Sequence, residues 1–115
     1  MRVLIVDDFP PKLDLLVALT RRLRPDAEIV IAQGFVEGRG AIVANDFDIA
    51  LFDNRLHDGS GMELYRLARK QQIPVALVVS AHEPATEEEQ RTIVDVRKAS
   101  EAISGAFVAV ELCGV

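Results

Sequence analysis

The sequence predicts an α/β fold in which helices cover both faces of a parallel sheet, and two observations lead to this prediction. Short apolar runs alternate with helical patterns along the chain, and the connections between them are short. Three of these runs are followed at once by polar groups: the pair Asp7-Asp8, then Asp53, then Ser80. Because the carboxyl ends of neighbouring parallel strands form one crevice, we expect these groups to meet there.

The first strand, helix and second strand follow from residues 2–32. Residues 2–6 are a short apolar run, which is typical of a strand buried on both faces. Pro10-Pro11 begins a helix, since proline is tolerated in a first turn, and Arg24-Pro25 ends it. The helix carries an apolar stripe between these points, and residues 28–32 predict the second strand.

Two further strands and two further helices are expected before residue 81. Residues 35–44 predict a weaker helix, which we expect to be frayed or mobile because Gly38 and Gly40 interrupt it. Residues 48–52 predict the third strand, residues 61–71 the third helix and residues 74–79 the fourth strand.

After Ala81 the sequence allows two arrangements. In the first, residues 92–97 form the fifth strand, a closing helix begins near Ser100, and residues 83–91 form a loop or a shortened fourth helix. In the second, Thr86 and Glu89 form a capping box, the helix runs to about residue 103, and residues 106–110 are the last strand. The second arrangement fits local propensity better. We favour the first because it completes the domain and propensity is a weak constraint.

Composition excludes several classes of function. The length of 115 residues predicts one domain, over residues 1–115, with a core of its own. A formal net charge of −5 argues against nucleic-acid binding, which needs a basic surface. No apolar run approaches the ~20 residues that cross a bilayer, and the acidic pair begins within seven residues of the start, which indicates no signal peptide. The single cysteine, Cys113, permits no internal disulfide, so we expect a cytoplasmic protein.

The expected carboxylate cluster is suited to phosphoryl chemistry. Adjacent strands lie roughly 4.8 Å apart, so several carboxylates could share one small ion. Oxygen ligands without a Cys or His cluster favour Mg²⁺ over zinc. A carboxylate is also a competent covalent nucleophile for a phosphoryl group, and the transfer depends mainly on positioning and on neutralisation of charge.

These motifs together resemble the receiver domain of bacterial two-component response regulators. The first strand with Asp7-Asp8, the run Asp53-Asn-Arg-Leu-His-Asp-Gly with its following Ser-Gly, and Val-Ser80-Ala occur in the family's order and spacing. His57 stands where the family usually has proline. The resemblance covers at least residues 1–81 and implies a flavodoxin-like five-stranded sheet with strand order 2-1-3-4-5, here with an irregular fourth helix.

The resemblance also implies a role for each matching residue. Asp53 would be the phosphoacceptor, Asp8 with Asp53 and the backbone carbonyl of Arg55 would bind Mg²⁺, and Asp7 would hold the ion mainly through water. Ser80 would hydrogen-bond the new phosphoryl oxygen. The family has a further lysine at the end of the fifth strand, which pairs with the phosphoryl group. Lys98 fills that position only in the first arrangement, and it then stands earlier in the sequence than the family's spacing expects.

Two functional hypotheses follow from this resemblance. The first is a single-domain response regulator, not a conventional enzyme, that takes a phosphoryl group from a histidine kinase or phosphotransfer protein and is read by a downstream protein. The second is a pseudo-receiver, an interaction module that no longer turns over phosphate, and the displaced lysine motivates it. The unusual stretch over residues 82–98 predicts altered partner contacts or a homodimer, with no direct contact to nucleic acid or membrane.

Overall fold

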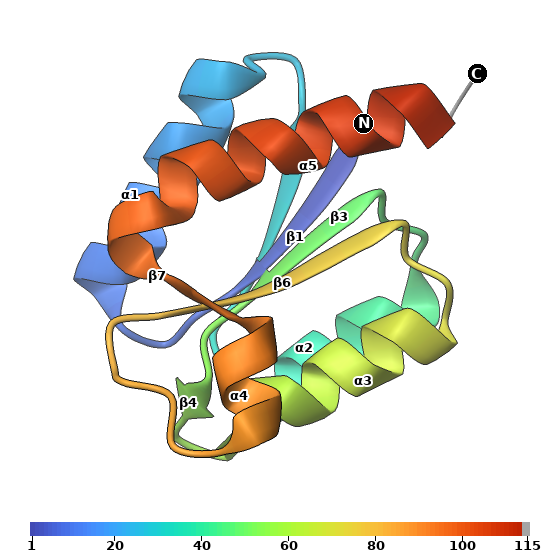
Figure 1. The fold of residues 1–115 in the computed structure, drawn as a ribbon. Coiled ribbons are helices and arrows are strands. Elements are labelled where there is room, and N and C mark those ends of the chain that lie inside the picture. The colour runs from blue at the N-terminus through green and yellow to red at the C-terminus, as the bar shows by residue number, and fades with distance from the viewer. Residues whose placement is uncertain (114–115) are drawn as a thin grey trace.

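Five parallel strands form the central sheet in the computed structural model, which describes residues 1–113 (Figure 1). The strands are β1 (Arg2–Val6), β2 (Glu28–Ala32), β3 (Ile49–Phe52), β6 (Val75–Ser80) and β7 (Ile93–Asp95). They lie in the order β2-β1-β3-β6-β7, and every neighbouring pair is parallel. The predicted fold class and strand order are therefore confirmed.

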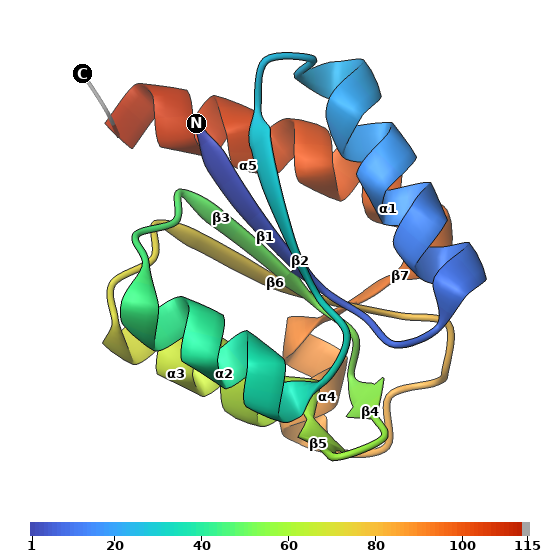
Figure 2. The same ribbon diagram turned by 180° about the vertical axis from the view of Figure 1, so that it is seen from behind.

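Helices cover both faces of this sheet (Figures 1 and 2). Helices α1 (Pro10–Leu23) and α5 (Ala99–Cys113) pack on one face, and α2 (Phe35–Ala44) and α3 (Gly61–Lys70) pack on the other. Successive residues of β1 point to opposite faces, so Leu4 joins the α2–α3 core whereas Val3 joins the α1–α5 core. Both faces are buried, which explains why the strands read as continuous apolar runs.

Gly38 has a packing role inside α2. A Cβ atom built on it would lie 3.0 Å from both methyl carbons of Val6 and 3.2 Å from a methyl of Leu64. The glycine therefore lets α2 approach the sheet and α3 closely. Residues 35–44 form a helix as predicted, and the expected mobility of that helix stays a prediction.

The structure decides between the two arrangements after Ala81 in favour of the first. Helix α4 (Glu87–Thr92) is short, and the Thr86 hydroxyl caps it by accepting a hydrogen bond from the Glu89 amide at 3.0 Å. The helix stops because the next three residues pair with β6 as strand β7. A helix reaching residue 103 and a strand over residues 106–110 were both wrong alternatives, since η1 (Val96–Lys98) and α5 occupy that part of the chain.

A small antiparallel hairpin, which the sequence did not predict, lies between β3 and α3. It consists of β4 (Arg55–Leu56) and β5 (Gly59–Ser60), and Arg55 pairs with Ser60. The Ser60 hydroxyl then caps α3 by accepting a hydrogen bond from the Met62 amide at 3.1 Å. The hairpin thus connects the end of β3 directly to the first turn of α3. Within residues 1–113, no helix is both long enough and apolar enough to cross a membrane.

Candidate functional site: a carboxylate cluster at the ends of the strands

The ends of β1 and β3 are in register, and this brings the predicted acidic residues together. Val6 is paired with Phe52, and the amide of Asp53 donates to the Val6 carbonyl at 2.8 Å. Asp7 and Asp53 follow these paired residues directly. One carboxylate oxygen from each of Asp7, Asp8 and Asp53 lies within 4.8 Å of the others. The structure therefore forms the carboxylate cluster that the sequence predicted at this edge of the sheet.

Asp7 is the most deeply buried member of the cluster, with none of its surface exposed. Its Oδ1 accepts a hydrogen bond from the Phe9 amide at 2.9 Å. Its Oδ2 lies 3.1 Å from the Lys12 ammonium without hydrogen-bond geometry, and among the described residues it is left without a hydrogen-bond partner. Burial raises the pKa of Asp7 and the charge of Asp53 adds to the rise, whereas the Phe9 N–H and Lys12 oppose it.

Lys12 is a member of the site that the sequence analysis missed. Its side chain is only 8% exposed, and its Nζ lies 2.8 Å from Oδ1 of Asp53. The same ammonium donates to the backbone carbonyl of Val79, near the end of β6. The chain therefore supplies a cation of its own to Asp7 and Asp53. The available signal was position, because Lys12 stands four and eight residues before Leu16 and Thr20 on the buried stripe of α1.

Asp8 is held by the residue that replaces the family's usual proline. The backbone amide of His57 donates to Oδ2 of Asp8 at 2.7 Å, and Nδ1 of the His57 ring lies 2.9 Å from the same oxygen. Proline has no N–H, so only a non-proline residue can make the first of these hydrogen bonds. The substitution therefore adds a donor to one of the predicted metal ligands.

Asp58 stabilises α2 rather than the carboxylate cluster. Its two oxygens accept hydrogen bonds from the amides of Phe35 at 2.5 Å and Val36 at 3.1 Å, at the N-terminus of α2. These hydrogen bonds lower the pKa of Asp58. The loop that follows Asp53 is thereby fixed to a second helix.

Ser80 lies at the end of β6, and Lys98 lies three residues beyond the end of β7. Ser80 is the last residue of β6, is 2% exposed, and its hydroxyl accepts a hydrogen bond from the His82 amide at 3.0 Å. Lys98 ends η1 with an exposed side chain. Over residues 1–113 it forms no ion pair, so the structure does not bring it into the carboxylate cluster as it does Lys12. The predicted roles of both residues stay predictions.

A hollow of about 360 Å³ opens above the cluster. Its lining includes Asp8, Lys12 and Asp53 together with Arg55, whose carbonyl was the fourth predicted metal ligand, and with His82. Helix α4 lies beside this end of the sheet (Figure 1), and the side-chain Nδ2 of Asn54 donates to Oε2 of Glu89 in that helix at 3.2 Å. The cluster is thus open to a small ligand and bordered by the unusual segment after Ala81.

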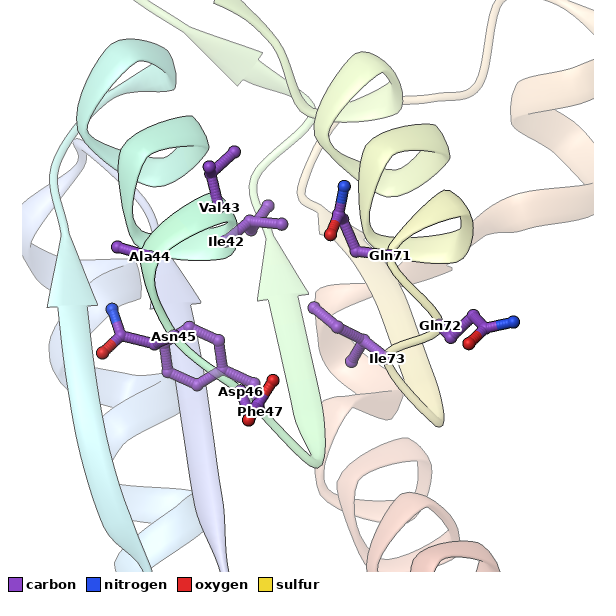
Figure 3. A pocket seen from close by; sticks show the side chains of 9 residues that line it. All are labelled: Ile42, Val43, Ala44, Asn45, Asp46, Phe47, Gln71, Gln72 and Ile73. Carbon is purple, nitrogen blue, oxygen red and sulfur yellow. The ribbon is translucent and has the colours of Figure 1, made fainter.

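A second hollow, of about 320 Å³, lies between the C-terminal ends of α2 and α3 (Figure 3). Ile42 and Val43 line it from α2, and Gln71 and Gln72 line it just after α3. Asp46 is its one ionisable residue. It lacks the converging charges that the first hollow has, so the candidate site is the carboxylate cluster.

Comparison with known proteins agrees with this fold. No protein-family model matches the sequence. The response regulator protein PilR of Pseudomonas aeruginosa is 37% identical over 81 residues, which are 69% of this chain and 18% of that protein. A CheY-like response regulator receiver domain protein from Methanospirillum hungatei JF-1 superimposes with a TM-score of 0.76 at 27% identity, covering 96% of each chain. The chain belongs with the response regulator receiver domains.

This receiver domain spans less than a fifth of PilR's length. The response regulator TrrA of Thermotoga maritima, whose structure was solved in complex with Mg²⁺ and BeF, has the same fold. Its TM-score is 0.70 at 19% identity, with 91% of this chain and 97% of that chain covered.

Proposed function

We propose that this receiver domain accepts a phosphoryl group on Asp53 from a histidine kinase or a histidine phosphotransfer protein. The observation that supports this most directly is the cluster of Asp7, Asp8 and Asp53, whose oxygens lie within 4.8 Å of one another beneath an open hollow. As a signalling protein of the cytoplasm, the phosphorylated domain would be read by a downstream protein partner.

The residues present fit a magnesium ion. Three carboxylates converge, and one buried oxygen of Asp7 has no hydrogen-bond partner within residues 1–113. A hard divalent cation prefers such oxygen ligands and retains water. Asp8, Asp53 and the carbonyl of Arg55 would hold Mg²⁺, and Asp7 would act mainly through water. The ion would supply neutralising charge to the phosphoryl oxygens, as the complex of TrrA with Mg²⁺ and BeF suggests.

Asp53 has the position that a nucleophile needs. A carboxylate oxygen of Asp53 would attack the phosphorus atom, so an O–P bond forms while the P–N bond to the donor imidazole breaks. The imidazole nitrogen keeps the electron pair of that bond and takes up a proton. Asp53 is 7% exposed and lines the hollow, so it is shielded from bulk water yet reachable by a donor group.

The pseudo-receiver is a second candidate, and the position of Lys12 favours it. The Lys12 ammonium lies between Asp7 and Asp53 and already supplies the cluster with a cation. A domain stabilised in this way could keep its fold and its partner surface without binding Mg²⁺ or phosphate. Self-association through residues 82–98 would fit either candidate, and the mass of the particle in solution would test it.

Intact-mass spectrometry after incubation with acetyl phosphate separates the two candidates. The wild-type chain is expected to gain one phosphoryl group in the presence of Mg²⁺ and none with a chelator. Asp53→Asn should not be labelled. Asp58→Asn is the matched control, since Asp58 lies in the same loop but caps α2, and it should still be labelled. An unlabelled wild type beside a labelled control receiver would favour the pseudo-receiver.

A further inference from the structure

We propose that Lys12, from the first helix, pairs with the phosphoryl group on Asp53. In this chain it would take the role that the resemblance gives to a lysine after the fifth strand. The inference rests on the proposed phosphorylation of Asp53 and adds a residue that the family pattern does not place there.

The surroundings of Lys12 are those of a fixed charge rather than a solvated one. The Lys12 ammonium donates hydrogen bonds to Oδ1 of Asp53 at 2.8 Å and to the Val79 carbonyl, and its Nζ lies 3.1 Å from Oδ2 of Asp7 as an ion pair. A buried charge is costly unless its partners satisfy it. These three groups therefore hold Nζ at the carboxyl ends of β1, β3 and β6.

The charge of the cluster explains why this placement is useful. Three carboxylates and one ammonium carry a formal charge of −2, which one divalent cation would balance. Phosphorylation replaces the single charge of Asp53 by the larger charge of a phosphoryl group. Because Lys12 already contacts Oδ1 of Asp53, it can follow that carboxyl group and pair with the added oxygens without crossing the site.

Lys98 is the natural comparison. Lys98 is the lysine that follows the fifth strand, at the end of η1 after β7, but its side chain is exposed. Lys12 is 8% exposed and lines the same hollow as Asp53. A buried ammonium that is already oriented loses less side-chain freedom on pairing than an exposed one. The two lysines therefore offer a direct test of which one serves the phosphoryl group.

The first experiment compares the same chemical change at both lysines. Phosphorylation by acetyl phosphate is followed for Lys12→Met, Lys12→Arg and Lys98→Met. The rate constant for Lys12→Met should fall roughly 100- to 1000-fold, as when one stabilising donor is removed from a charged transition state. Lys12→Arg should retain part of the rate. Lys98→Met should stay within about twofold of the wild-type rate, because an exposed charge outside the cluster contributes little.

Binding of Mg²⁺ distinguishes this role from a purely structural one. Calorimetric titration of Lys12→Met with Mg²⁺ should give tighter binding than wild type, because the competing ammonium is gone. Weaker binding together with a lower melting temperature would instead indicate that Lys12 only supports the fold, and would overturn the inference.

A measurement on the wild-type chain is decisive even where Lys12→Met does not fold. The chain has three lysines, Lys12, Lys70 and Lys98, so selective ¹³C or ¹⁵N labelling of lysine should give three resolvable side-chain signals. Phosphorylation should shift the Lys12 signal and leave that of Lys98 in place. A shift at Lys98 alone, or at neither residue in a labelled protein, would overturn the inference. A wild type that is never phosphorylated would instead refute the proposed function itself.

Discussion

Gly61 is the position where a single methyl group should most directly disturb the candidate site. It begins α3, and a Cβ atom built on it would lie 2.0 Å from the backbone oxygen of Asp53 and 2.7 Å from the carbonyl carbon. Since real Cβ contacts essentially never fall below 3.0 Å, Gly61→Ala requires a shift of about 1 Å in the backbone of Asp53. No described glycine has a positive φ, so the constraint is close approach rather than conformation.

The stability cost can be estimated from this overlap. Overpacking of a tightly packed position costs about 1–3 kcal/mol. With about 2.1 cal/mol/K of unfolding entropy per residue, a chain of 115 residues shifts its Tm by about 4 °C for each kcal/mol. Gly61→Ala should therefore lower Tm by about 4–12 °C. Because the displaced backbone belongs to Asp53, labelling by acetyl phosphate should also become slower.

Gly105→Ala is the matched control for this substitution. Gly105 lies inside α5, and a Cβ atom there would meet nothing within 4 Å. Alanine in a helix interior is about 0.5–1 kcal/mol more favourable than glycine, so Tm should rise by about 2–4 °C. Differential scanning calorimetry of both variants measures the contrast. Equal changes in Tm, or unchanged stability in Gly61→Ala, would refute the close approach of α3 to the end of β3.

Three further substitutions test the local interactions around the site. Thr86→Ala removes the cap of α4 and should destabilise that helix by about 1 kcal/mol, seen as faster hydrogen exchange over residues 87–92 with exchange in α5 unchanged. Asp58→Ala should lower Tm at neutral pH because the first amides of α2 lose their acceptor. The pKa of Asp58 is lowered in the folded protein, so its stabilising effect is present above pH 3.8, the ordinary pKa, and is lost as pH falls through the pKa of the folded protein. The melting curves of Asp58→Ala and wild type should therefore converge in acid. Arg97 lowers the pKa of Asp95 to about 2. The free energy of unfolding measured with urea should therefore differ between Asp95→Asn and wild type at pH 6 but not at about pH 2. Added salt should reduce the difference. A constant difference across this pH range would contradict the pairing with Arg97.

The parts of the fold that were predictable are those with repeated local signals. Continuous apolar runs identified β1 and β3, because strands buried on both faces need apolar residues at every position. The prolines at the start of α1 and after its end marked that helix correctly. Where each local pattern agreed with the tertiary packing, the element followed from the sequence.

The region after Ala81 shows where local signals stop being sufficient. The cap at Thr86 was correctly identified, yet the helix that it begins ends after Thr92. Ile93 and Val94 leave the helix because they pair with Val78 and Val79 at the edge of the sheet. That pairing is a tertiary interaction, and helix propensity alone does not report it.

The candidate site was predictable in its carboxylates but not in their partners. Residues at strand ends meet by a general rule of parallel sheets, which located Asp7 and Asp53. Lys12 was missed because a lysine on an apolar stripe is usually expected to reach solvent, and its three partners come from different strands. The contact between the His57 amide and Asp8 spans 49 positions in the sequence, so no local pattern indicates it.

Locating the modified residue tests most directly whether Asp53 carries the phosphoryl group. Borohydride reduction converts an aspartyl phosphate to homoserine, which peptide mass spectrometry can assign to one position after treatment with acetyl phosphate and Mg²⁺. Homoserine is expected at position 53 in the wild type, with Asp7 and Asp8 unchanged. Homoserine at Asp7 or Asp8, or no conversion in a sample where a control receiver is converted, would contradict phosphorylation of Asp53.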